Sequence, residues 1–315
     1  MNTGARYLAE RLTADFGFYL REGQLLARER SAWQEIEVFD NPLFGRVMRI
    51  DGCFMTSERD EFFYHEPMVH LPAVAHVGPA SALVVGGGDG GAVEELLKHP
   101  GMQRVLLAEL DGAVIDMARQ WLGGIHHGAL DDPRLEVRLG DARTLIEAPG
   151  GERFDQIVLD LTDPYGPALD LYTAAFYQAC RRRLTPGGVL SLHLGSPIHR
   201  PQAMARIAAS LRAAFPIVRP YLQYVPLYGT LWCMAMASDT TDPARLTAAE
   251  VDARIAERGL TGLQLYNGPM HQALLAQPNF VRELLARPAR ALERGEVLEE
   301  VGELAMGPEV AVVLG

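Results

Sequence analysis

From about Ser81 onward, short apolar runs alternate with helical segments, and this alternation constrains the fold more than any other feature. Runs of strand length lie at residues 82–85, 104–110, 135–139, 154–161 and 189–194, with helical patterns between them. Strands that alternate with helices need crossover connections, which give a mostly parallel sheet covered by helices on both faces. The sequence therefore predicts an α/β fold with a doubly wound sheet. Residues 217–225 and 231–238 predict an antiparallel pair that closes this sheet.

The region before this alternation has a different pattern. Residues 16–20, 23–31, 33–41 and 44–52 are rich in strand-forming residues and are separated by Gly, Asn and Pro. Residues 57–76 predict a helix up to its prolines, with Ser57 as N-cap. Gly78 and Pro79 mark the predicted boundary, which gives a small β-strand domain at 1–76 and a larger α/β domain at 77–315. In the tail from Thr240, the sequence predicts helices with a loop at 267–278.

A glycine loop follows the first strand of the alternation, in the sequence Val84-Val85-Gly86-Gly87-Gly88-Asp89-Gly90-Gly91. Glycines at this point let the backbone approach a ligand closely, although the same loop also suits a simple tight turn. Glu109, Asp141 and Asp160 end the next three strands. Ligands bind at the carboxyl ends of such strands, so the four features together predict a nucleoside site.

Asp89 limits which nucleoside that site accepts. A carboxylate in the glycine loop repels phosphate, which disfavours NAD and ATP, and it also repels the carboxylate of S-adenosylmethionine. It favours a nucleoside that carries a terminal ammonium.

Two further carboxylates follow the fourth predicted strand. Asp160 and Asp163 lie in a Pro/Gly-rich loop, and residues 154–180 contain four aspartates but no Lys or Arg. Such a loop can be a solvated cap, but it also predicts a cation site in which one carboxylate deprotonates an amine and the other holds it. Tyr64 and His65 lie among acids at residues 58–66, where a charged helix start is the simpler interpretation.

The composition limits the possible partners. With 29 basic and 40 acidic residues the chain carries a formal charge of −11, which disfavours nucleic acid. Cys53, Cys180 and Cys233 are far apart and show no metal-ligand spacing, so we expect reduced thiols, a cytoplasmic location and no metal. No apolar run approaches about 18 residues, which predicts no membrane span.

Taken together, residues 56–66 (TSERDEFFYHE), the loop VVGGGDGG, Glu109, residues 140–142 (GDA), LDLTDPYGP and VPLY resemble the spermidine synthase family, the polyamine aminopropyltransferases. The resemblance runs from about Trp33 to residue 278. It implies a Rossmann-like, methyltransferase-type doubly wound sheet with a small N-terminal β domain. It also implies transfer of an aminopropyl group from decarboxylated S-adenosylmethionine, a co-substrate, to an amine, with release of methylthioadenosine and no cofactor. A homodimer or homotetramer is implied as well.

The resemblance also implies a role for each matching residue. Asp160 would be the general base. The donor would be bound by Gln34, His65, Gly86, Gly88, Asp89, Glu109, Asp141 and Ala142. The acceptor amine would be oriented by Tyr64, Asp163, Tyr228 and His193.

Three positions near the expected acceptor site depart from the family pattern. Met55 and His193 replace glutamines found in many members, and the tyrosine segment reads VPLYGTLW. The resemblance implies putrescine as the default acceptor. Because the loss of the amides changes the hydrogen-bonding capacity of the acceptor site, spermidine or an agmatine-like amine stays open. For His193, a structural role as a packed histidine within a strand is as well supported as a role in acceptor binding.

Two other functions stay open. A polyamine N-methyltransferase shares this fold and most of these motifs, but it would use S-adenosylmethionine, whose carboxylate conflicts with Asp89. A non-catalytic polyamine or nucleoside binding protein would not need Asp160 and Asp163 placed together after a strand.

Overall fold

A seven-stranded sheet forms the centre of the protein in a computed structural model that describes residues 7–13, 15–164 and 166–298. The strand order is β12-β13-β11-β10-β7-β8-β9, in which β7 to β11 run parallel while β12 and β13 are antiparallel to their neighbours. The strands are β7 (Ser81–Gly86), β8 (Arg104–Glu109), β9 (Leu135–Leu139), β10 (Phe154–Asp160), β11 (Leu184–Gly195), β12 (Ile217–Val225) and β13 (Thr230–Ser238). The predicted doubly wound sheet and its antiparallel closing pair are confirmed.

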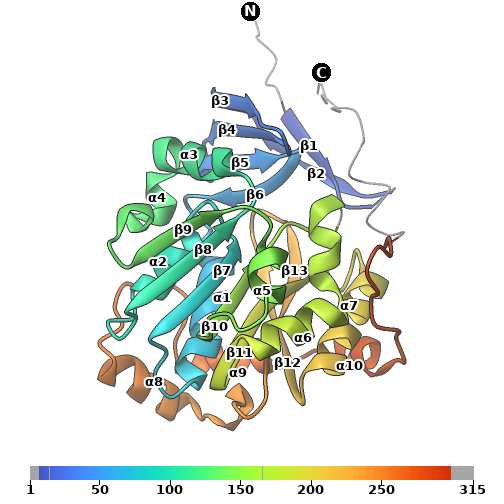
Figure 1. The fold of residues 1–315 in the computed structure, drawn as a ribbon. Coiled ribbons are helices and arrows are strands. Elements are labelled where there is room, and N and C mark those ends of the chain that lie inside the picture. Colours follow the sequence, from blue (N-terminus) through green and yellow to red (C-terminus); the bar gives the residue numbers. More distant parts are fainter. Residues whose placement is uncertain (1–6, 14, 165, 299–315) are drawn as a thin grey trace, which may run out of the picture.

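Helices cover both faces of this sheet (Figure 1). They are α1 (Phe62–Ala75), α2 (Gly91–Leu97), α3 (Gly112–Trp121), α4 (Gly123–His126), α5 (Ala142–Glu147), α6 (Ala174–Arg182), α7 (Pro201–Ala214), α8 (Ala248–Glu257), α9 (Gly268–Leu275) and α10 (Asn279–Ala286), with 3₁₀ turns at Ala129–Asp131, Gly166–Tyr172 and Pro243–Arg245. Successive strand residues point to opposite faces. Val84 therefore packs in the core beneath α1 to α3, while Leu83 and Val85 pack in the core beneath α5 to α7.

The N-terminal region forms two small antiparallel sheets, drawn above the large sheet in Figure 1. They are a hairpin of β1 (Tyr7–Arg11) and β2 (Gly17–Arg21), and a four-stranded sheet of β3 (Leu25–Arg30), β4 (Glu35–Asn41), β5 (Gly45–Ile50) and β6 (Cys53–Ser57). This confirms the predicted small β domain. The division at residue 76 stays a prediction, and residues 1–6 and 299–315 of the two predicted domains lie outside the described residues.

Three local predictions were wrong. Ser57 ends β6 and is not the N-cap of α1, because its hydroxyl hydrogen-bonds Asp60 instead of a helix amide. The helix runs through Pro67 and Pro72, since it is buried from Tyr64 to Ala75 and packing there outweighs the cost of proline. Residues 267–278 are not a continuous loop, because the Asn267 side chain caps α9.

Within the described residues, no helix has both the length and the apolar character needed to cross a bilayer.

Candidate active site

A pocket of about 300 Å³ opens at the carboxyl ends of β7, β8 and β10, beneath the four-stranded sheet. Eleven of the predicted site residues line it, namely Gln34, Tyr64, His65, Gly86, Gly88, Asp89, Glu109, Asp141, Ala142, Asp160 and Tyr228. The other two, Asp163 and His193, line a smaller adjoining compartment. The structure thus brings together residues that are separated by up to 194 positions along the chain.

The glycines of the loop are required by close approaches of the neighbouring elements. Gly86 has a φ of +74°, and a Cβ there would lie 2.2 Å from the carbonyl oxygen of Asp160. At Gly91, a Cβ would lie 2.2 Å from the His65 ring. The absence of side chains at these glycines therefore allows α1 and β10 to approach the loop, so that His65 and Asp160 lie close together.

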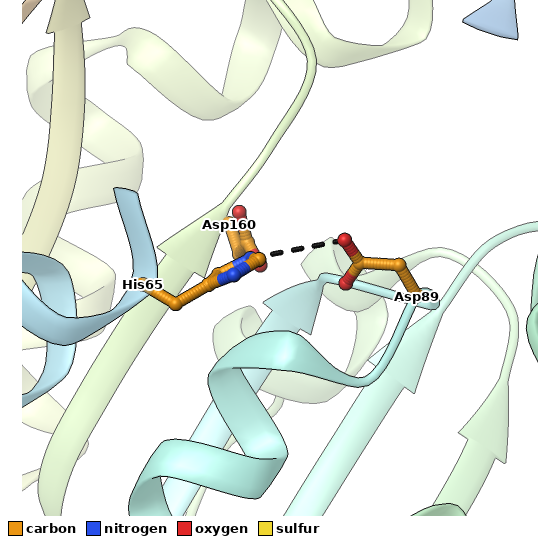
Figure 2. Close-up of side chains that lie close together, drawn as sticks. All are labelled: His65, Asp89 and Asp160. Carbon is orange, nitrogen blue, oxygen red and sulfur yellow. Dashed lines mark ion pairs between the residues drawn. The ribbon is translucent and has the colours of Figure 1, made fainter. Parts of the chain in front are cut away.

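His65 lies at the centre of a buried group of carboxylates. Its Nδ1 is 2.8 Å from Glu61 Oε2, and its Nε2 is 3.7 Å from both Asp89 Oδ2 and Asp160 Oδ2 (Figure 2). Burial disfavours the imidazolium, but the carboxylates of Asp89, Glu61 and Asp160 outweigh it and raise the pKa of His65. A protonated His65 among three ionised carboxylates leaves two negative charges uncompensated. The group therefore favours a ligand that carries positive charge.

Asp160 has the environment of a proton acceptor. Burial raises the pKa of its carboxyl above the usual aspartate range, His65 opposes this rise, and Asp89 adds to it. Oδ2 of Asp160 makes no hydrogen bond to the described residues. A buried carboxylate with a raised pKa and a free oxygen suits a general base near neutral pH.

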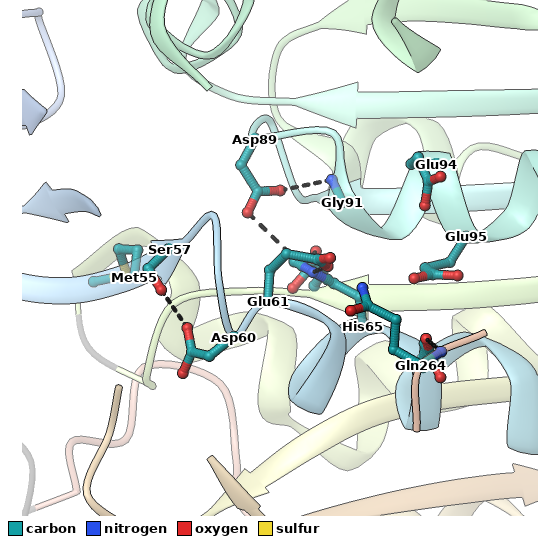
Figure 3. Close-up of polar contacts among 12 residues, drawn as sticks. Met55, Ser57, Asp60, Glu61, His65, Asp89, Gly91, Glu94, Glu95 and Gln264 are labelled. Carbon is teal, nitrogen blue, oxygen red and sulfur yellow. Dashed lines mark hydrogen bonds and ion pairs between the residues drawn. The ribbon is translucent and has the colours of Figure 1, made fainter. Parts of the chain in front are cut away.

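Asp89 is held by its own loop. Its Oδ1 accepts a hydrogen bond of 3.2 Å from the backbone N–H of Gly91, and its Oδ2 faces His65 (Figure 3). This arrangement fixes the carboxylate at the start of α2 without a Lys or Arg partner among the described residues.

Glu109 and Gln34 line the pocket from the regions of two different sheets. Glu109 ends β8, and its Oε1 accepts a hydrogen bond of 2.9 Å from the N–H of Asp111. Burial raises the pKa of Glu109 to about 7, although hydrogen bonds from backbone N–H groups oppose this rise. Gln34 donates from Nε2 to Asp111 Oδ2 at 3.0 Å, and Ser31 Oγ donates to the same oxygen at 2.6 Å. Asp111 thus connects the region of the four-stranded sheet to the pocket wall at Glu109, and the sequence did not predict this link.

Asp141 lies at the pocket but has a partner in the protein. It caps α5 by accepting from the N–H of Arg143, and the Arg143 guanidinium binds both of its oxygens at 2.7–3.1 Å. These hydrogen bonds hold the pKa of Asp141 below its usual value. Arg143, two residues away, was not recognised in the sequence.

Tyr64 and Tyr228 separate the pocket from the smaller compartment and line both. Their ring centroids are 6.1 Å apart at 72°, and Tyr228 donates to the backbone oxygen of Met55 at 2.8 Å. Burial, with the charge of Asp160, raises both hydroxyl pKa values well above the usual range, so both tyrosines stay neutral. Neutral aromatic faces beside carboxylates suit an organic cation.

In the smaller compartment, Asp163 has a basic partner that the sequence did not indicate. Asp163 has no Lys or Arg near it in sequence, yet it forms an ion pair with Arg200, which lies at the start of α7. His193 stacks on Trp232 with ring centroids 5.5 Å apart, and its Nε2 lies 2.7 Å from the Tyr172 hydroxyl. His193 is therefore both packed and exposed to the compartment.

Comparisons with known proteins agree with this geometry. Residues 61–247 match the spermine/spermidine synthase domain, and residues 8–58 match the spermidine synthase tetramerisation domain. The chain is 61% identical to a polyamine aminopropyltransferase of Nitrosomonas europaea, over 94% of this chain and 90% of that one. The chain belongs to the spermidine synthase family.

Solved structures of this family show the same fold. A spermidine synthase in complex with the transition state analogue AdoDATO superposes with a TM-score of 0.83 at 34% identity, covering 89% of this chain and 94% of that one. The spermidine synthase of Thermotoga maritima gives a TM-score of 0.80 at 33% identity, with 89% and 93% covered. The predictions of family, fold class and aminopropyltransferase activity are confirmed, while the roles of individual residues stay predictions.

Proposed function

We propose that this spermidine synthase family member moves the aminopropyl group of decarboxylated S-adenosylmethionine to putrescine, with no cofactor and no metal. The observation that carries the proposal is the group of Asp89, Asp160 and His65 at one end of the nucleoside pocket. Together with Glu61, which also contacts His65, this group holds two negative charges beyond the one that a protonated His65 balances. These two charges match the two positive charges of this donor, one on the sulfonium and one on the ammonium.

The donor is held along the carboxyl ends of the strands. Glu109 accepts hydrogen bonds from the ribose hydroxyls, and Ala142 and Asp141 border the adenine. Gly86 and Gly88 let the nucleoside approach the backbone, and Gln34, fixed by Asp111, closes the pocket from the four-stranded sheet. Asp89 binds the aminopropyl ammonium.

The chemical step is an in-line displacement. The acceptor nitrogen forms a bond to the aminopropyl carbon next to sulfur while the carbon–sulfur bond breaks, and the electron pair of that bond stays on sulfur in methylthioadenosine. Asp160 first takes a proton from the ammonium of the acceptor, because a protonated amine has no lone pair, and the neutral amine then attacks. His65 holds Asp160 and Asp89 in place, and the protein gains most of its rate from this alignment.

The acceptor reaches Asp160 between Tyr64 and Tyr228. Its non-reacting end extends toward Asp163 and His193 in the smaller compartment. Putrescine has the length for this path, with one amine at Asp160 and the other beyond the two tyrosines.

One assay tests the activity and the alternatives together. The protein is mixed with putrescine and either decarboxylated or ordinary S-adenosylmethionine, and the nucleoside products are identified by mass spectrometry. We expect methylthioadenosine from the decarboxylated donor only, with the same rate after chelation of metals. S-adenosylhomocysteine as the product would instead support the N-methyltransferase, and the absence of both products would support a binding protein.

We also propose a cytoplasmic homodimer or homotetramer that assembles through the N-terminal sheets. Large apolar side chains are exposed there at Phe16, Tyr19, Leu25, Trp33 and Leu43, and the family model matched by residues 8–58 is described as a tetramerisation domain. Light scattering coupled to gel filtration measures the mass, and a mass of 34.5 kDa, that of one chain, would contradict assembly.

A further inference from the structure

The compartment next to the nucleoside pocket contains an ion pair that the chemical step does not use. The two cavities adjoin, since both are lined by Met55, Tyr64, Leu161, Thr162 and Tyr228. Beyond the two tyrosines, the compartment is lined by Glu10 from β1, Asp163 after β10 and Arg200 at the start of α7. This is where the non-reacting end of an acceptor must lie.

Arg200 already occupies the carboxylate of Asp163. Its side chain is only 10% exposed, and its guanidinium forms an ion pair with Asp163 Oδ2. Breaking a buried pair by removing one partner is costly, because it leaves the other charge without compensation. The ammonium of an acceptor must therefore compete with a guanidinium that the protein itself supplies.

Among the described residues that line the compartment, one carboxyl group then stays available, that of Glu10. Glu10 accepts a hydrogen bond of 2.6 Å from the N–H of Phe54, and burial raises its pKa to about 8. An ammonium that enters next to Glu10 stabilises its ionised form, so this residue can match one additional positive charge. His193 adds an uncharged acceptor: its Nε2 faces Tyr172 and the Leu161 oxygen, and its Nδ1 has no partner among the described residues.

The space beyond the tyrosines is limited as well. The compartment measures about 50 Å³, and a water molecule needs about 10–15 Å³ of such space. It holds the end of a diamine, whereas a triamine adds four more non-hydrogen atoms and another positive charge.

We propose that Arg200 is a specificity-determining residue. By pairing with Asp163 it leaves one carboxyl group for the non-reacting end of the acceptor, and it thereby selects a diamine over a triamine. This inference rests on the proposed aminopropyl transfer and adds to it the residue that limits the acceptor.

The test compares kcat/KM for putrescine and spermidine at saturating decarboxylated donor, in the wild type, Arg200→Ala and Arg200→Lys. We expect kcat/KM of the wild type to be at least about tenfold higher for putrescine than for spermidine, because the loss of one hydrogen bond to a charged group lowers binding by about this factor. Arg200→Ala frees Asp163 and adds space, so its preference falls by about tenfold through faster use of spermidine. Arg200→Lys keeps the ion pair and most of the preference.

Arg206→Gln is the matched control, because Arg206 lies on the same helix and pairs with Glu296 away from the compartment. Should Arg200→Ala fail to fold, Arg200→Gln takes its place, since an amide still donates to Asp163 without a charge. A folded variant that binds donor normally but keeps the wild-type preference within twofold overturns the role of Arg200, as does a wild type that uses both amines equally. A wild type that forms no methylthioadenosine with any amine overturns the proposed function itself.

Discussion

The pocket at the ends of β7, β8 and β10 and the smaller compartment beside it differ in how their carboxylates are paired. In the pocket, Asp89, Asp160 and Glu109 have no Lys or Arg partner among the described residues, and backbone N–H groups and His65 hold them. In the compartment, Asp163 is paired with Arg200, and burial keeps Glu10 close to neutral. Asp141 at the pocket is paired with Arg143, but the other three carboxylates leave negative charge for a ligand, whereas the compartment has neutralised most of its own.

This difference follows from where the residues lie along the chain. The pocket is built at the ends of adjacent parallel strands, so its acids recur once per strand–helix unit. The compartment is built where β1, the loop after β10, the start of α7 and β13 meet. In the proposed function, the unpaired carboxylates of the pocket bind the doubly charged donor, and the ion pair of the compartment limits the charge that is available to the acceptor.

Replacing Asp160 should produce the largest effect in the pocket. We expect Asp160→Asn to lower kcat about 10³-fold, the range for loss of a general base, with donor affinity unchanged within a few-fold. In the wild type, kcat should fall as the pH is lowered and Asp160 takes up a proton. Because burial raises its pKa, this fall should begin above the usual aspartate value of about 3.9. Rapid-quench turnover and donor titration measure the two quantities separately.

Asp155→Asn is the control for this variant, since Asp155 starts the same strand but binds the backbone of Ala80 and Ser81 far from the pocket. Turnover that survives in Asp160→Asn would mean that another group accepts the proton.

Replacing Glu109 should affect binding instead of chemistry. We expect Glu109→Gln to weaken donor binding by about 10- to 100-fold, because charged hydrogen bonds to the ribose contribute about 1.5–3 kcal/mol, while kcat at saturation changes little. Wild-type donor affinity should also decrease as the pH falls through about 7, where Glu109 becomes protonated. Isothermal titration at several pH values checks both effects. A loss of kcat without a loss of affinity would assign Glu109 to the chemical step.

The sequence predicted the residues of the pocket better than those of the smaller compartment. Alternating strands and helices predicted the large sheet, and strand-end acids predicted Asp89, Glu109 and Asp160, because periodicity and strand ends are local features. Arg200 could not be found this way, since it pairs across 37 positions with an aspartate that has no basic neighbour in sequence. Asp111 and Arg143 each lie two residues from a predicted acid, and the spacing alone did not reveal the contacts they make.

Asp89 tests whether the charge kept in the pocket selects the donor. We expect Asp89→Asn to reduce the affinity for decarboxylated S-adenosylmethionine by about tenfold, because one charged hydrogen bond to the ammonium becomes neutral. Affinity for ordinary S-adenosylmethionine should rise, since its carboxylate no longer meets a negative charge. Competition between the two nucleosides measures the ratio. An unchanged ratio would place the donor ammonium away from Asp89.

Glu10 gives the smallest effect and tests whether the compartment is held near neutrality. Its pKa is raised from 4.5 to about 8 in the folded protein, so the proton is bound more tightly in the folded state. Stability from this source is fully present below about pH 4.5 and is lost as the pH rises through about 8. Glu10→Gln keeps an acceptor for the N–H of Phe54 and removes the buried charge. We therefore expect its Tm to exceed that of the wild type by about 2–4 °C at pH 9 and to match it near pH 5. Glu29→Gln, at an exposed position on β3, controls for the loss of one surface charge. A wild type as stable as Glu10→Gln at pH 9 would mean that Glu10 ionises at little cost, and the compartment would then keep negative charge as the pocket does.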